Sequence, residues 1–202
     1  MIVTLFGASA PDLNQYDEAY RLGYNIGQSN NILKNGGYGG TMEASAKGCM
    51  AAGGEVIGVG VIGHKIDALG HPNAFNTSFI TKENVTQRIE EMLNTDLIIV
   101  LPGRLGTLEE LFVAWIKSIE GQATSIFLVG SQFKKLIEFL VENMFIKLDN
   151  LKYINLIASV EDIQFGKDGQ IFLREFQAFS EAGKVINLKD YVYKCKEEEK
   201  FA

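Results

Sequence analysis

The chain alternates short apolar runs with longer segments in which apolar residues recur every three or four positions. An unbroken apolar run of about four to eight residues is typical of a buried parallel strand, and the longer repeat is typical of a helix with one buried face. The strands predicted from these runs are 2–7, a weaker one at 31–37, 55–62, 96–103, 123–130 and a short one at 156–160. The predicted helices are 14–30, 41–54, 82–94, 107–120, 131–145 and 170–182.

Regular alternation of strands and helices predicts one α/β domain over residues 1–202, with a Rossmann-like, doubly wound parallel sheet. Two segments fall outside the alternation. Residues 63–80 have no clear periodicity and are expected to overhang the site, and residues 190–202 form a charged tail. In such a sheet ligands bind at the carboxyl ends of the strands, so the turns there are where we look for chemistry.

Composition narrows the function classes. The chain has 202 residues, 47% of them hydrophobic and 22% charged, which fits a globular domain with a sizeable core. A net charge of −6 without a basic run argues against binding to a nucleic acid polymer. Two distant cysteines and two histidines, which we expect to be bystanders, do not make a disulfide framework or a zinc site. Without a signal sequence or a membrane-spanning run, we expect a cytoplasmic protein with no membrane partner.

A glycine-rich turn, "NGGYGGTMEAS" at 35–45, precedes the second predicted helix. Free N–H groups at a helix start attract an anion, and glycines let the backbone approach it. The alternative is a tight strand-to-helix turn. Met42 stands where a dinucleotide fingerprint has glycine or alanine, and no acid closes the strand at 55–62, so an NAD-dependent oxidoreductase is disfavoured.

The stretch "LPGRLGTLEE" at 101–110 has a pattern typical of a phosphate-binding loop. Pro102 ends the strand, Gly103 and Gly106 permit unusual backbone angles, and Thr107 is predicted to cap the following helix. Glu110 has two possible roles: a functional carboxylate, or the partner of Thr107 in a capping box.

Two further side chains are candidates. Arg88 lies on the apolar face of the helix at 82–94, where an unpaired guanidinium is costly, so we expect an anionic partner from elsewhere in the fold. The alternative is a surface pair with Glu91. Ser9, in "FGAS" at the end of the first strand, offers a hydroxyl group or belongs to an ordinary small-residue turn.

Together these stretches resemble the Lonely Guy family of phosphoribohydrolases, once commonly labelled lysine decarboxylases. "PGRLGTLEE" matches the family loop Pro-Gly-Gly-x-Gly-Thr-x-x-Glu except at Arg104, and "GGYGGTM" matches its Gly-Gly-x-x-Gly-x-Met turn. "QRIEEM" supplies the arginine of the preceding helix as Arg88. The resemblance covers roughly residues 1–130.

The resemblance implies a dimer that hydrolyses the N-glycosidic bond of a nucleoside 5′-monophosphate to free base and ribose 5-phosphate, without a metal or organic cofactor. Glu110 would stabilise the positive charge that develops on the ribose, which is the chemistry of glycosidases, and Arg88 would position it. The expected substrate-binding residues are Ser9, Gly37, Gly39, Gly40, Met42, Pro102, Gly103, Arg104, Gly106 and Thr107.

Arg104 replaces a glycine of the family loop and has two opposite interpretations. Its guanidinium could pair with a phosphate, compensating for Asn94 where relatives often have a second arginine, or it could fill the space that the phosphate needs. The second interpretation favours a carrier that binds a nucleotide or molybdenum cofactor without cleaving it. The base that a hydrolase would release is left open.

Overall fold

The computed structural model describes residues 1–62, 71–122, 124–166, 170–179 and 185–194. The strands are β1 Ile2–Phe6, β2 Ile32–Asn35, β3 Glu55–Val61, β4 Ser78–Lys82, β5 Leu97–Val100, β6 Ser125–Val129, β7 Ile154–Ile157, β8 Ile163–Phe165, β9 Gln170–Phe179 and β10 Val185–Lys194. The α-helices are α1 Leu13–Gln28, α2 Thr41–Ala51, α4 Val85–Leu93, α5 Leu105–Lys117 and α6 Ser131–Glu142. Short helical turns at Ser118–Gln122, Leu148–Tyr153 and Val160–Asp162 join the later elements.

The described strands form one sheet in the order β10-β9-β7-β6-β5-β1-β2-β3-β4, with β8 paired to β9. From β4 to β7 all neighbours run parallel, and β8, β9 and β10 pair antiparallel at one edge. The Rossmann-like parallel sheet is therefore confirmed, with an antiparallel extension. Chain order reverses at β1, where β2 lies on one side and β5 on the other. The carboxyl end of β1 is consequently the switch point at which such folds bind ligands.

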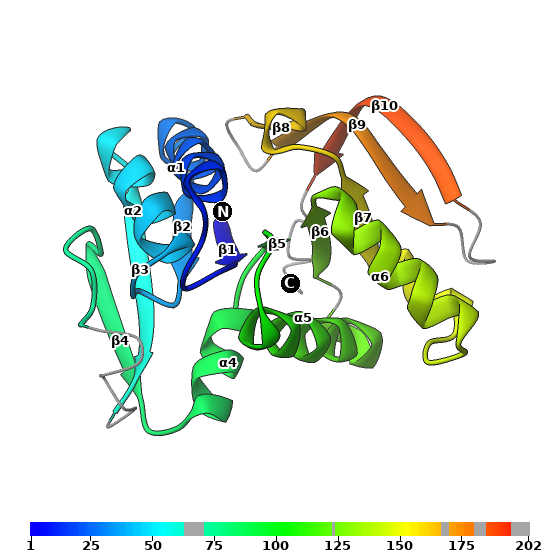
Figure 1. Cartoon of the computed structure of the whole chain (residues 1–202). Helices are drawn as coiled ribbons and strands as arrows, with labels where there is room; N and C mark the ends of the chain where they lie inside the picture. The colour runs from blue at the N-terminus through cyan, green and yellow to red at the C-terminus, as the bar shows by residue number, and fades with distance from the viewer. Residues whose placement is uncertain (63–70, 123, 167–169, 180–184, 195–202) are drawn as a thin grey trace, which may run out of the picture.

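Helices cover both faces of the parallel sheet (Figure 1). Leu97 and Ile99 of β5 pack with the buried side of α1 and α2, whereas Ile98 and Val100 pack with residues of α4, α5 and α6. Because both faces are covered, successive residues of β5 are all buried. This explains the apolar run without alternation that predicted a central strand.

The C-terminal part differs most from the prediction. The expected helix at 170–182 is wrong, because residues 170–179 form β9. Phe172 and Phe176 have helical spacing, but Phe172 is 41% exposed while Ile171 and Leu173 are buried, which is the period-two pattern of a strand. The strand predicted at 156–160 begins two residues earlier, and β4 was not predicted.

The predicted charged tail at 190–202 also needs correction. Residues 190–194 belong to β10, and residues 195–202 lie outside the described part of the chain. No helix among the described residues has both the length and the hydropathy that a membrane span requires.

Candidate functional site

A pocket of about 410 Å³ opens at the switch point. Its walls come from the end of β1, the glycine-rich turn after β2, the end of β3, helix α4 and the start of α5. Its described lining residues are Gly7, Ser9, Tyr38, Met42, Val61, Val85, Arg88, Ile89, Arg104, Gly106, Thr107, Glu109 and Glu110. The volume is within the usual range for small-molecule sites, about 300–1,000 Å³.

Arg88 and Glu110 form an ion pair in the wall of this pocket. Nη1 of Arg88 lies 3.1 Å from Oε1 of Glu110, and each side chain is 14% exposed. Nε of Arg88 donates to the carbonyl of Val59 at 2.8 Å, which fixes the guanidinium against the end of β3. The partner expected from elsewhere in the fold is therefore Glu110. The alternative pair with Glu91 is not formed, because Glu91 contacts Lys82 and Lys34 instead.

The glycine-rich turn makes room for this pair. A Cβ atom at Gly36 would lie 2.2 Å from Nη2 of Arg88, so the guanidinium occupies space that any other residue would fill. The turn and the ion pair are thus parts of one arrangement, although Arg88 and Glu110 follow Gly36 by about 50 and 75 residues in the sequence.

The carboxyl group of Glu110 is unusual in its ionisation. Burial raises the pKa of Glu110 to about 7, although the neighbouring Arg88 acts in the opposite direction. The group therefore exchanges its proton near neutral pH, which is the range in which a carboxyl group can serve as an acid or a base.

Helix α5 begins without a cap from a side chain among the described residues. Its N-cap is Arg104, and Thr107 lies inside the first turn, where its hydroxyl donates to the carbonyl of Gly7 at 2.9 Å. The predicted cap at Thr107 is wrong, and so is the capping box, because Glu110 turns to Arg88. The helix starts earlier than predicted because Leu105 and Gly106 are already helical.

The first N–H groups of α5 are consequently available to an anion. Exposed Arg104 and Gly106 lie on the pocket wall beside them. A negatively charged group in this part of the pocket would meet the positive end of the helix and a guanidinium together.

The other predicted substrate-binding residues shape the turns. Gly37 and Gly40 adopt positive φ angles of 72° and 73°, and Gly40 packs against Ala8 and Ser9 at the end of β1. The described lining includes Ser9 and Met42, but not Gly37, Gly39, Gly40, Pro102 or Gly103.

Several lining residues were not predicted: Gly7, Tyr38, Val61, Val85, Ile89 and Glu109. Of these residues, Tyr38 is the one that the sequence could best have indicated, since a large aromatic residue between two pairs of glycines is unusual. The aliphatic residues carry no such signal, because they look like ordinary core.

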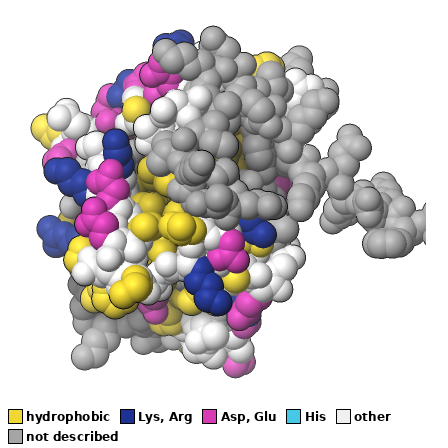
Figure 2. All heavy atoms as spheres, turned by 90° about the vertical axis from the view of Figure 1, so that its right-hand side faces the viewer, with side chains coloured by type: hydrophobic (Ala, Val, Ile, Leu, Met, Phe, Trp, Pro, Cys, Tyr) yellow, Lys and Arg dark blue, Asp and Glu magenta, His cyan; other side chains and the backbone are white. Residues whose placement is uncertain are grey.

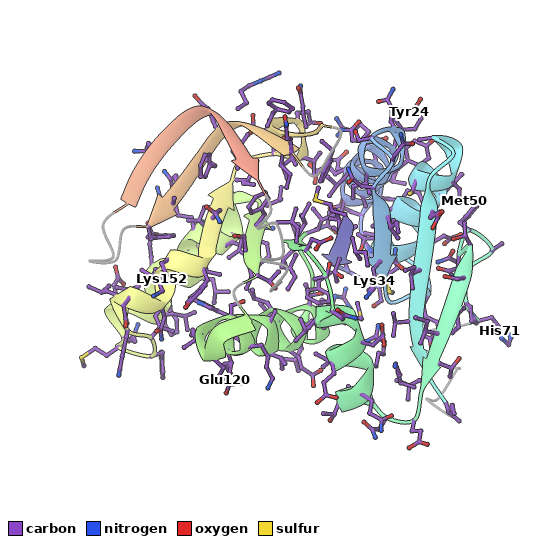
Figure 3. All side chains as sticks on the ribbon, turned by 180° about the vertical axis from the view of Figure 1, so that it is seen from behind. Tyr24, Lys34, Met50, His71, Glu120 and Lys152 are labelled. Atoms are coloured by element: carbon purple, nitrogen blue, oxygen red, sulfur yellow. The ribbon has the colours of Figure 1, made fainter. Side chains whose placement is uncertain are left out.

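The segment expected to overhang the site lies partly outside the described residues, which omit 63–70 and therefore His64. The described end of this segment is hydrogen-bonded to the glycine-rich turn. The backbone N–H of Asn73 and Nδ2 of Asn76 both donate to the carbonyl of Gly37. His71 is exposed and projects outward from the molecule (Figure 3). Among the described residues, no group of histidine, cysteine and acidic side chains could hold a metal ion.

A mostly parallel sheet with a pocket at its switch point places the chain among the Rossmann-like folds. Within that class, the sequence profile described as the SLOG cluster4 family matches residues 1–143. The chain belongs to this family, which is consistent with its resemblance to the Lonely Guy family.

The chain is also similar to individual proteins. An uncharacterized protein of Archaeoglobus fulgidus is 34% identical over 115 residues, which are 56% of this chain and 73% of that protein. The molybdenum cofactor carrier protein of Chlamydomonas reinhardtii has a similar structure, with a TM-score of 0.61 and 22% identity over 79% of this chain and 91% of that one. A molybdenum cofactor binding protein of Rippkaea orientalis gives the same TM-score and identity, over 79% of this chain and 89% of that one. At these identities the two structures establish the shared fold.

Proposed function

We propose that this protein hydrolyses the N-glycosidic bond of a nucleoside 5′-monophosphate and releases the free base and ribose 5-phosphate. The observation that carries the proposal is the Arg88–Glu110 pair in the wall of the pocket that the uncapped start of α5 also lines. The pocket thus combines a candidate anion site with the carboxyl group of Glu110, which can gain or lose its proton near neutral pH.

In the proposed complex the phosphate binds the first N–H groups of α5 and the guanidinium of Arg104. The ribose then lies over Glu110. As the bond between C1′ and the base breaks, its electron pair leaves with the base and positive charge develops on the ribose. The carboxylate of Glu110 stabilises that charge and accepts a proton from the water that attacks C1′.

Arg88 has a positioning role in this scheme. It is held by Val59 on one side and by Glu110 on the other, so it keeps the carboxyl group in one orientation. Its positive charge also favours the ionised form of Glu110, which the reaction requires.

Incubation of the purified protein with AMP and a panel of other nucleoside monophosphates tests the proposal, with chromatography for free base and ribose 5-phosphate. We expect release by the native protein and a loss of at least about 100-fold in Glu110→Gln, since electrostatic stabilisation is usually the largest catalytic contribution. Glu120→Gln is the matched control, because Glu120 is exposed and pairs with Lys117 outside the pocket. Equal release by native protein and Glu110→Gln would contradict the assignment.

A carrier is the second candidate, in which the pocket binds a nucleotide or the molybdenum cofactor without cleaving it. Arg104 in place of the family's glycine favours it, and so does the fold shared with proteins described as molybdenum cofactor carriers. A monophosphate that raises the melting temperature while no base is released would support the carrier.

We also infer that the protein acts as a homo-oligomer in the cytoplasm. The face of the molecule that includes α6 has hydrophobic side chains gathered between charges of both signs (Figure 2). The exposed large hydrophobic residues of α6 and the turn after it are Phe139, Met144 and Phe145. Light scattering on the native protein and on Phe139→Lys measures the mass in solution, and a native monomer would refute the inference.

A further inference from the structure

Tyr38 is a pocket residue to which the scheme above gives no role. It lies in the glycine-rich turn after β2, is only 6% exposed, and lines the pocket together with Val61. A phenol in the wall of a ligand site combines an apolar ring with one directional polar group.

The ring of Tyr38 is held in place from several directions. It packs edge-on against Phe79 of β4, with ring centroids 6.0 Å apart and an angle of 79°. Its backbone carbonyl accepts a hydrogen bond from Nδ2 of Asn73 at 2.8 Å. At Gly60 a Cβ atom would lie 2.6 Å from the hydroxyl oxygen, so the phenol needs a glycine in β3 to reach its position. The side chain is therefore fixed before any ligand binds.

The hydrogen-bonding state of the hydroxyl points to a missing acceptor. Its oxygen accepts from the backbone N–H of Val61 at 3.3 Å, and within the described part of the chain it donates to no partner. A tyrosine hydroxyl has one hydrogen to donate, and leaving a buried donor unpaired is unfavourable. Because Tyr38 and Val61 both line the pocket, a bound ligand is the natural acceptor.

The order of the strands indicates which part of a bound nucleotide lies near this hydroxyl. Helix α5, with the anion site, follows β5, whereas the hydroxyl of Tyr38 lies beside the end of β3, and β1 and β2 separate the two strands. The side chain of Arg88 spans the distance between β3 and α5, since it contacts Val59 of β3 and Glu110 of α5. If the phosphate binds α5 and the ribose lies over Glu110, as in the proposed function on which this step rests, the base reaches Tyr38.

We propose that the Tyr38 hydroxyl donates a hydrogen bond to an acceptor nitrogen of the base, and that this bond strengthens as the base departs. When the bond between C1′ and the base breaks, both electrons remain on the base and make its ring nitrogens more basic. The Tyr38 hydrogen bond stabilises that negative charge. The water oxygen bonds to C1′, Glu110 takes one water proton, and the base finally receives a proton through solvent.

Binding measurements test the contact without any need for catalysis. Calorimetry compares AMP with ribose 5-phosphate on the native protein and on Tyr38→Phe, which keeps the ring and removes the hydroxyl. We expect the AMP affinity to fall about 5- to 10-fold, as the loss of one hydrogen bond predicts, with ribose 5-phosphate within about twofold. Tyr24→Phe is the control, because Tyr24 lies on α1, away from the pocket (Figure 3), and neither ligand should be affected.

Hydrolysis tests the second half of the proposal. The base of nicotinamide mononucleotide leaves as a neutral molecule, so it develops no negative charge for Tyr38 to stabilise. Tyr38→Phe should lower kcat for AMP at least about tenfold more than for nicotinamide mononucleotide, in line with catalysis by hydrogen donation.

The outcomes separate the two proposals. Unchanged AMP affinity in Tyr38→Phe, or equal losses for AMP and ribose 5-phosphate, overturns the contact with the base. Retained ribose 5-phosphate binding shows that the variant is folded. AMP binding that depends on Tyr38 without base release leaves the contact standing and refutes only the hydrolase. A native protein that binds neither compound refutes both.

Discussion

At Glu110 two opposing influences act on one carboxyl group, and burial outweighs the nearby positive charge of Arg88. The pKa of about 7 follows from this balance and not from the sequence motif. The same residue in a capping box on an exposed helix would stay near its ordinary value. Its surroundings therefore turn a common helix residue into a candidate for acid–base chemistry.

The first consequence concerns the dependence of activity on pH. If the carboxylate is the active form, kcat/KM for the substrate rises as the pH increases through about 7 and then levels off. Rates measured between about pH 5 and pH 9 give the profile. A rate that falls over this range would assign Glu110 the opposite role, that of an acid that protonates the base.

A second consequence does not depend on any ligand. The ordinary pKa of this carboxyl group is 4.5, so between about pH 4.5 and pH 7 the folded protein holds a proton that the unfolded chain has lost. The contribution of Glu110 to the free energy of unfolding therefore decreases as the pH rises through this interval, by an amount on the order of 3 kcal/mol. Urea unfolding of native protein and Glu110→Gln at pH values below and above the interval should show the native protein losing stability relative to the variant. Parallel curves would mean that the pKa is not raised.

A substitution at Arg104 distinguishes its two interpretations, a phosphate-binding guanidinium and a side chain that fills the space of the phosphate. Arg104→Gly restores the family's glycine, and if the guanidinium binds phosphate, the affinity for inorganic phosphate or ribose 5-phosphate should fall about tenfold, with weaker dependence on salt. Titrations at low and high ionic strength give both quantities. Tighter binding in the variant would show that Arg104 obstructs the anion site.

At the scale of elements, helix α4 is anchored by a buried lysine. Lys34 is 2% exposed and extends from β2 to the carboxyl end of α4, where Nζ donates to the carbonyls of Glu91 at 3.0 Å and Asn94 at 2.6 Å (Figure 3). The carboxylate of Glu91 also contacts Lys34 and Lys82. A cation at the carboxyl end of a helix interacts favourably with the last carbonyls, and that of Glu91 accepts from the N–H of Asn94 as well. Since α4 carries Arg88, this anchor also sets the position of the ion pair.

Lys34→Met tests the anchor. We expect the free energy of unfolding to fall by about 2–4 kcal/mol, because the substitution removes the donor to the Asn94 carbonyl and one positive partner of the Glu91 carboxylate. Activity should fall as well, because Arg88 shifts. Lys117→Met removes an exposed lysine that pairs with Glu120 and should change stability by less than about 0.5 kcal/mol. Urea unfolding of both variants gives the comparison. Equal effects of the two substitutions would show that Lys34 anchors nothing.

Apart from β4, which has no fully buried residue, the elements from β1 to α6 followed from periodicity, because their strands are largely buried and each helix has one buried side. The elements after α6 could not be predicted in this way, since β9 is only partly buried and its phenylalanines repeat at helical intervals. In the site, Arg88 on an apolar helix face correctly predicted a distant anionic partner. The sequence could not reveal the start of α5 or the orientation of Tyr38, because both depend on contacts with residues far away in the chain.

On the scale of the whole molecule, residues beyond the family match belong to the core. The matching profile ends at residue 143, yet Ile171, Leu173 and Phe176 of β9 are buried in the same cluster as α1 and α2. Figure 1 shows β8, β9 and β10 continuing the sheet next to β7. The C-terminal part thus covers a sheet edge and completes one side of the hydrophobic core.

Leu173→Ala measures that contribution. Leu173 is 1% exposed, so truncation to alanine should lower the free energy of unfolding by about 2–5 kcal/mol through lost burial and an unfilled cavity. Phe172→Ala, two-fifths exposed on the opposite side of the strand, should cost much less. Thermal unfolding reports both, and similar melting temperatures for native protein and Leu173→Ala would argue that the C-terminal strands are not part of the cooperative core.

The described lining of the switch-point pocket falls entirely between Gly7 and Glu110. The later strands support the sheet without contributing a described side chain to that wall. The pocket and the C-terminal strands can therefore be inherited separately. A lineage could lengthen, replace or fuse its C-terminal part and still pass on the same pocket. Family members with unlike C-terminal regions should accordingly be compared through this first half of the chain, and chimaeras that exchange the part after α6 should retain the ligand preference of their N-terminal parent.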